Sequence, residues 1–197
     1  MFTLLPPATR ALILINVAVF LVQQLAWNPM LELFALWPPG SGHFQPWQLI
    51  TYAFLHGNLV HIFFNMFALF MFGRSLELYW GGRRLVMFYL VCVLTAALTQ
   101  LAVQGASGEQ EEVIGASGGV FGVLLAFAWY FPRQRLFVIP IPIPIPAWLF
   151  VTVYALAELL YGVTGRQQGV AHFAHLGGML GGALCILYWR ARRRFSS

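Results

Sequence analysis

Val113-Ile-Gly-Ala-Ser117-Gly-Gly-Val-Phe121-Gly-Val-Leu-Leu-Ala-Phe-Ala-Trp-Tyr-Phe131 is a stretch without a single charged side chain. A bilayer core needs about 20 apolar residues per helix, so this stretch predicts a membrane-spanning helix. Near its start, Gly115-Ala116-Ser117-Gly118 places a hydroxyl among small residues. Hydrocarbon offers that hydroxyl no partner, and close packing of helices does not require serine at this position. Ser117 is therefore a candidate functional residue.

The whole chain has the composition of a membrane protein. Of its 197 residues, 60% are hydrophobic and 9% are charged, whereas soluble domains are about 25% charged. Each long apolar stretch must be helical, because lipid cannot satisfy an open backbone. The sequence thus predicts an all-α membrane protein, a six-helix bundle forming one domain over residues 1–197. The expected spans are 11–27, 59–76, 85–103, 113–131, 146–163 and 170–189.

The arginines predict the orientation of these spans. If the spans alternate in direction, ten of the eleven basic residues fall on one side, and only Arg166 falls on the other, with Glu109, Glu111 and Glu112. Cytoplasmic loops carry an excess of Arg and Lys, so both termini are expected in the cytoplasm. The first span lacks a cleavage site and is expected to be retained. Topology accounts for the net charge of +5, and no nucleic-acid partner is expected.

Several polar residues share one depth in this topology. His61 and Asn65 lie near the outer end of the second span, Ser117 lies about one turn into the fourth, and His172 and His175 lie about one to two turns into the sixth. Intramembrane polar groups are costly and usually face the bundle interior. Serine with histidine indicates nucleophilic catalysis. His61 and Asn65 share a helix face and can donate to a developing oxyanion.

Glycine spacing predicts which helices touch. Small residues four apart let backbones approach closely in lipid, and both the fourth and the sixth spans carry two such pairs. If these faces pack together, Ser117 and His175 come within hydrogen-bond reach. The pairs are Gly115 and Gly119, Gly118 and Gly122, Gly177 and Gly181, and Gly178 and Gly182.

Other site chemistries fit the sequence less well. The chain has no Asp, which excludes a Ser-His-Asp triad and a paired-Asp protease, and it lacks the His-Glu-x-x-His of metalloproteases. Glu158, in the fifth span, is interpreted as a structural or gating hydrogen bonder rather than a third catalytic member. No metal and no cofactor are expected. A transporter would predict inverted repeats or broken helices at midplane, and no convincing repeat is seen.

Three remaining features indicate structure more than chemistry. Residues 28–58, rich in aromatics and proline, are expected to lie partly in the membrane interface. Residues 139–146 alternate Ile and Pro, which predicts an extended, polyproline-like spacer, or alternatively a proline-rich ligand. Cys92 and Cys185 are expected to be buried thiols.

Three motifs resemble those of the rhomboid intramembrane serine proteases in their six-helix bacterial form. They are His56-Gly-Asn-Leu-Val-His61-Ile-Phe-Phe-Asn65, Gly115-Ala-Ser117-Gly118 and Ala174-His175-Leu-Gly-Gly178-Met-Leu-Gly-Gly182; Gly73-Arg74-Ser-Leu-Glu77 is also typical. The resemblance implies a Ser–His dyad with Ser117 as nucleophile. It implies an oxyanion site formed by Asn65, His61 and the Ser117 amide. It also implies that Phe121, where many relatives have Tyr, packs on the catalytic imidazole.

The resemblance also chooses between two histidines. His172 and His175 both follow alanine, so the local sequence leaves the choice open. The family motif has glycine three and seven residues after its histidine, which implies His175 as the general base, followed by Gly178 and Gly182.

The activity that the resemblance implies is cleavage of transmembrane segments of other membrane proteins. Substrates with helix-weakening residues are expected, in a bacterial inner membrane, with the site open to the outer side. The alternative is a rhomboid-like protein that binds membrane clients without cutting them.

Overall fold

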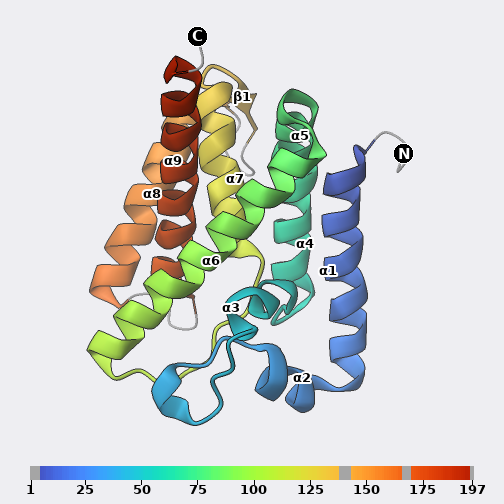
Figure 1. The fold of residues 1–197 in the computed structure, drawn as a ribbon, viewed down its shortest axis with the longest axis vertical. Helices are drawn as coiled ribbons and strands as arrows, with labels where there is room; N and C mark the ends of the chain where they lie inside the picture. The colour runs from blue at the N-terminus through green and yellow to red at the C-terminus, as the bar shows by residue number, and fades with distance from the viewer. Residues whose placement is uncertain (1–4, 138–142, 166–169, 196–197) are drawn as a thin grey trace.

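The computed structural model describes residues 5–137, 143–165 and 170–195, and it forms a bundle of helices (Figure 1). The bundle helices are α1 (Pro7–Leu25), α4 (Leu59–Ala68), α5 (Arg74–Trp80), α6 (Gly82–Ser107), α7 (Ser117–Tyr130), α8 (Ala147–Thr164) and α9 (His172–Phe195). A π-helical turn, η4 (Leu69–Gly73), joins α4 to α5. The start of α1 and the end of α9 lie at the same end of the bundle. The all-α membrane bundle expected from the sequence is confirmed.

Four helical stretches among the described residues are long and apolar enough to cross a membrane. These are Pro7–Leu25, Leu59–Trp80, Gly82–Ser107 and Ala147–Thr164. The helix α7 is apolar but has only 14 residues, and α9 is not among the four. The number of spans therefore stays a prediction. Arg166, the basic residue assigned to the outer side, lies outside the described residues.

The segment before α7 is extended because other parts of the chain hold its backbone. Val113 pairs with Leu36 through two backbone hydrogen bonds of 3.0 Å, and the Gly115 amide donates to the Tyr52 carbonyl at 3.0 Å. The helix consequently begins at Ser117, four residues after the start of the expected span. Fourteen helical residues rise about 21 Å, less than the roughly 30 Å of a bilayer core. Figure 1 shows α7 starting well inside the bundle.

The connection between α1 and α4 closes the opposite end of the bundle. It contains α2 (Trp27–Phe34), η2 (Pro39–Ser41), α3 (Gln48–Thr51) and η3 (Tyr52–Phe54) (Figure 1). The fully buried Gln48 side chain organises it, since Nε2 donates to the His43 carbonyl at 3.0 Å and Oε1 accepts from the Gln45 amide at 3.1 Å. This connection supplies the Leu36 and Tyr52 backbone groups that hold the segment before α7.

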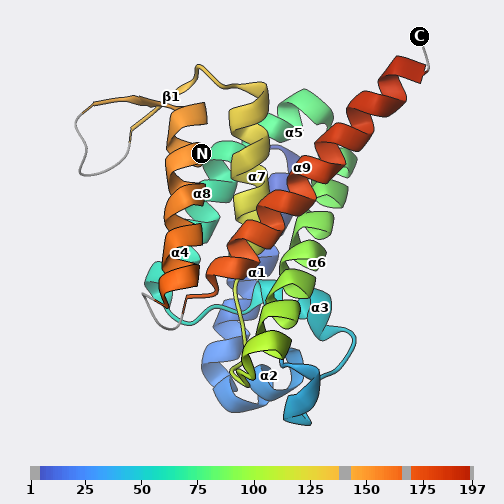
Figure 2. The same ribbon diagram turned by 90° about the vertical axis from the view of Figure 1, so that its left-hand side faces the viewer.

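Glycines bring α7 and α9 into backbone contact. A Cβ at Gly178 would lie 2.7 Å from the carbonyl carbon of Gly118, and one at Gly122 would lie 3.0 Å from the Gly178 oxygen. The packing predicted between these helices is thus confirmed. The remaining glycines of both helices face α6, which α9 crosses obliquely (Figure 2). There Gly119 packs on Tyr89, and Gly177 and Gly181 pack on Thr99 and Thr95.

Two short strands precede α8. The strand β1 (Arg135–Leu136) pairs antiparallel with β2 (Ile145–Pro146), in the register Arg135 with Pro146 and Leu136 with Ile145. Both strands are edges, the position in which a sheet accepts proline. The Ile-Pro spacer is thus strand at its end, while residues 138–142 lie outside the described residues.

The cysteines differ from each other in burial. Both are free thiols; Cys92 is buried in the core, as expected, but Cys185 is only half-buried. The Cys185 side chain lies on the part of α9 beyond the glycine contacts, where the helix is partly exposed.

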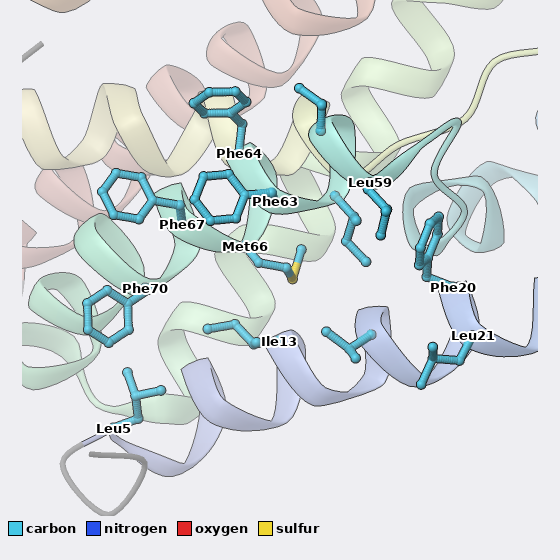
Figure 3. A pocket seen from close by; sticks show the side chains of 13 residues that line it. Leu5, Ile13, Phe20, Leu21, Leu59, Phe63, Phe64, Met66, Phe67 and Phe70 are labelled. Atoms are coloured by element: carbon cyan, nitrogen blue, oxygen red, sulfur yellow. The ribbon is translucent and has the colours of Figure 1, made fainter. Parts of the chain in front are cut away.

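One wide groove on the bundle surface is purely apolar. It lies between α1 and α4, has a volume of about 880 Å³, and is lined by Leu, Ile, Val, Phe and Met side chains such as Phe20, Phe63 and Met66 (Figure 3). Its lining carries no hydrogen-bonding side chain. In a bilayer such a surface accommodates acyl chains, and the polar residues of interest lie elsewhere.

Candidate active site

The serine and one histidine singled out by sequence meet in the structure. Ser117 is the first residue of α7, and His175 lies about one turn into α9. The His175 Nε2 atom is 2.8 Å from the Ser117 Oγ atom. His175 is 8% exposed, whereas Ser117 is half-buried. A hydroxyl bonded to an imidazole nitrogen at this distance is the arrangement that activates a serine nucleophile.

Phe121 holds the His175 ring from one side. It lies one turn beyond Ser117 on α7, and its ring stacks on the imidazole with centroids 4.2 Å apart and planes 6° from parallel. This is the contact that the family resemblance implied for Phe121. A ring stacked on a phenyl face cannot rotate freely, so Nε2 stays directed toward the hydroxyl.

His172 does not take the place beside the serine. Its Nδ1 atom lies 2.7 Å from Glu158 Oε2, and its ring is 4% exposed. The centroid of the Tyr161 ring is 5.8 Å from that of His172. Of the two histidines, the structure brings only His175 within hydrogen-bond distance of Ser117 among the described residues.

Glu158 is the residue of this site for which the sequence indicated only a structural or gating role, without its contact to His175. Its Oε2 atom accepts from His175 Nδ1 at 2.8 Å and from His172 Nδ1 at 2.7 Å. The carboxylate is 4% exposed and stands behind the imidazole, opposite Ser117. One signal was available: Ala147, Val151 and Glu158, the buried residues of α8, share one helix face.

The same three residues offer donor atoms of the kind that bind metals. The ligand atoms of Glu158, His172 and His175 lie within 4.8 Å of one another. Hydrogen bonds from both Nδ1 atoms to the carboxylate require protons on those nitrogens, whereas a metal requires their lone pairs. The arrangement is therefore that of a hydrogen-bonded cluster, and the expectation of no metal stays a prediction.

His61 lies against the segment that leads to the serine. A Cβ at Gly115 would be 2.7 Å from His61 Cε1 and 3.7 Å from Ser117 Oγ, so the ring and the hydroxyl flank the same backbone. Gly115 also has φ of 128°, which favours glycine. The Gly57 amide donates to His61 Nδ1 at 3.4 Å. That bond leaves the proton on Nε2, which makes Nε2 a donor.

Asn65 carries an unused donor. It lies one turn beyond His61 on α4 and is 6% exposed. Within the described part of the chain, its Nδ2 atom has no hydrogen-bond partner. A buried amide without a partner is costly, and it calls for a ligand or a functional role.

His56, just before α4, is a buried neutral imidazole. Burial lowers its pKa to about 3, and nearby His61 adds to the effect. Between pH 6.5 and 3, His56 therefore binds a proton in the unfolded chain but not in the native chain. Its contribution to the free energy of unfolding is fully present above pH 6.5 and is lost as the pH falls. Each unit of pH in that window costs about 1.4 kcal/mol.

We expect His56→Phe to remove this loss. The ring nitrogens of His56 have no partner among the described residues, so phenylalanine sacrifices no hydrogen bond there. Between pH 6.5 and 5, the variant should lose about 2 kcal/mol less stability than the wild type. Thermal unfolding in detergent at the two pH values measures the difference. Equal losses in both proteins would contradict the prediction.

An all-α bundle of apolar helices with polar side chains buried between them is an integral membrane protein. This chain belongs to the rhomboid family, since residues 43–192 match the family described as Rhomboid domain. It is 26% identical over 196 residues to a protein named Rhomboid protease GlpG from Photorhabdus laumondii, covering 97% of this chain and 64% of that one.

Two further relatives extend the comparison. Rhomboid protein 1, mitochondrial, from Saccharomyces cerevisiae is 32% identical over 187 residues, covering 88% of this chain and 51% of the yeast protein. Rhomboid protease GlpG from Klebsiella pneumoniae is 29% identical over 124 residues, covering 62% and 43%. The chain thus spans less than two thirds of the length of these curated relatives.

Proposed function

We propose that this chain is an intramembrane serine endopeptidase that cleaves transmembrane segments of other membrane proteins. The observation that carries the proposal is the 2.8 Å contact between Ser117 Oγ and His175 Nε2, deep in a bundle of apolar helices. Relatives named as rhomboid proteases support the same reaction class.

The two side chains divide the chemistry between them. Ser117 Oγ attacks the scissile carbonyl carbon while His175 Nε2 accepts the hydroxyl proton, giving a tetrahedral oxyanion. The C–N bond then breaks as His175 returns the proton to the leaving amine, which leaves an acyl-serine. Water, deprotonated by His175, attacks this ester and releases the carboxylic acid and the free serine.

Three donors are available for the oxyanion. The Ser117 amide stands at the N-terminus of α7, where backbone N–H groups are unpaired and the helix dipole favours negative charge. The Nε2 proton of His61 and the unpartnered Nδ2 of Asn65 complete the set. Donors fixed before the reaction stabilise developing charge most effectively where water is scarce.

We expect the half-buried position of Ser117 to limit which substrates can be cut. A transmembrane helix hides its carbonyl carbons, so the client must unwind before Ser117 reaches one. Clients with helix-weakening residues in or near their membrane segments are therefore favoured. The proposed partners are these membrane clients and the surrounding bilayer, and no cofactor is expected to take part.

We propose a bacterial inner membrane with both termini in the cytoplasm and the serine opening toward the outer side. Support comes from two arginines that lie over tryptophan rings, Arg84 at the start of α6 and Arg190 near the end of α9. Arg84 lies 4.0 Å over the Trp189 ring, and Arg190 lies 5.7 Å from the Trp129 ring. Tryptophan is enriched at both membrane interfaces, and an excess of arginine is typical of the cytoplasmic side.

Purified protein in detergent, mixed with a transmembrane substrate, tests the proposal. The wild type should cut the substrate, and a fluorophosphonate probe should label Ser117. Ser117→Ala should abolish both cleavage and labelling while melting at the wild-type temperature. A wild type that binds the substrate without cutting it, and resists the probe, would point instead to client binding without catalysis.

Asn65→Ala tests the oxyanion assignment. Removing one such donor should lower kcat by about 10²–10³-fold with little change in KM. Because Nδ2 has no partner within the described residues, the loss should appear in rate rather than in stability. Steady-state kinetics and a thermal melt measure the two effects. An unchanged kcat would remove Asn65 from the site.

A further inference from the structure

We infer that Glu158 is a positioning residue: it holds the Nδ1 proton of His175 so that Nε2 faces Ser117, and it balances the charge that the imidazole gains. This inference rests on the proposed function and adds a third member to its Ser–His pair. It also revises the interpretation of Glu158 as a structural or gating hydrogen bonder.

The hydrogen bonds fix the tautomer of His175. An ionised carboxylate only accepts, so the 2.8 Å contact from Glu158 Oε2 places the proton on His175 Nδ1. Nε2 then keeps its lone pair, and that lone pair meets the Ser117 hydroxyl at 2.8 Å. With the proton on Nε2 instead, the ring would donate to the serine and be unable to act as a base.

His172 fixes the carboxylate in turn. Its Nδ1 atom donates to the same oxygen at 2.7 Å, so Oε2 is held between two imidazoles. Val151, Tyr154 and Glu158 lie on the face of α8 directed at α7 and α9, where Tyr154 contacts Phe121 with ring centroids 4.9 Å apart. Glu158 therefore reaches His175 from a packed helix and not from a loop.

The negative charge of Glu158 lies where it can stabilise a protonated His175. When Ser117 attacks, the imidazole becomes positive and a buried carboxylate stands 2.8 Å away. Such a pair is stronger in a water-poor interior than in bulk solvent. The other titratable groups around the pair are His172 on α9, His61 on α4, and Tyr154 and Tyr161 on α8. None of these described neighbours is a carboxylate, so Glu158 is the acidic group that faces His175.

Glu158→Gln tests the inference because it keeps the size of the side chain and removes its charge. We expect kcat/KM to fall by at least about 10²-fold. The acidic limb of the kcat/KM profile should also move to lower pH by about 1–3 units, because no carboxylate then favours the protonated imidazole. If Glu158 had a purely structural role, the acidic limb of the kcat/KM profile would stay at the same pH.

Glu77→Gln is the matched control. Glu77 is also buried, at 5% exposure, and accepts from Ala8 N at 2.8 Å and from Thr9 N and Thr9 Oγ, each at 2.6 Å. It holds the start of α1 and does not touch the site. This variant should melt earlier, yet it should keep the wild-type pH profile and the wild-type kcat/KM per folded molecule.

A second measurement does not depend on activity or on the Glu158→Gln variant. Proton NMR of the wild type should show a low-field imidazole N–H signal that disappears in His175→Ala and persists in Ser117→Ala. Absence of that signal, or an unchanged rate and pH limb in Glu158→Gln, would overturn the inference. Absence of cleavage and of probe labelling in the wild type would instead reject the proposed function.

Discussion

Replacing His175 with alanine should lower kcat by at least about 10⁴-fold, because the serine then has no base and the leaving amine has no acid. The substitution should slow the chemical step and leave substrate binding unchanged. Ser117 and the donors on α4 stay in place, so substrate affinity should change little. Single-turnover cleavage of a transmembrane substrate, measured with enzyme in excess, reports the chemical step directly.

His172→Ala is the matched comparison for that result. It removes the same side chain three residues away on the same helix, and it removes one of two donors to Glu158. Since the Nδ1 contact from His175 to Glu158 remains, we expect a loss of no more than about tenfold, well below the 10²–10⁴-fold usual for a general base. The reverse order, with His172→Ala inactive and His175→Ala active, would show that the assignment of the base is wrong.

Gly178→Ala should affect both stability and rate. The new Cβ would overlap the Gly118 carbonyl group, and backbone cannot move aside as a flexible side chain can. Overpacking of this kind costs about 1–3 kcal/mol. It also separates α7 from α9, and a displacement of about 1 Å between reacting groups can cost about 10²-fold in rate. Thermal unfolding and cleavage by the same preparation measure both effects.

Gly105→Ala is the control for replacing a helical glycine by alanine where no neighbour is in contact. Gly105 lies in α6, and a Cβ there meets nothing within 4 Å. Alanine favours the helix over glycine by about 1 kcal/mol, so this variant should be as stable as the wild type or slightly more stable, and fully active. If Gly178→Ala matched it in both properties, the backbone contact would not be what aligns the site.

The pairing of Ser117 with His175 could be predicted because its cause is local. Gly118 directly follows the serine and shares a helix face with Gly122, and Gly178 and Gly182 follow the histidine at helical spacing. Such spacing predicts close contact in lipid. The residues that decide the distance are therefore next to those that react.

Other features depend on contacts between distant segments. The start of α7 at Ser117 requires Leu36 and Tyr52 to hold Val113 and Gly115, which no local pattern reveals. The place of Glu158 depends on how α8 is rotated about its axis. One acid in a span predicts a polar partner, but it does not tell which of several polar side chains the acid will contact.

The backbone contact between α7 and α9 has a consequence for the membrane itself. A hydrolase within a bilayer needs water at one depth, while the membrane must not conduct protons along its whole thickness. Beyond Ser117, Gly118 and Gly122 of α7 meet Gly178 of α9 too closely for a side chain to fit between them. We therefore expect these glycines to exclude water and ions from the contact between α7 and α9, so that the proposed protease could hydrate Ser117 without conducting protons across the membrane.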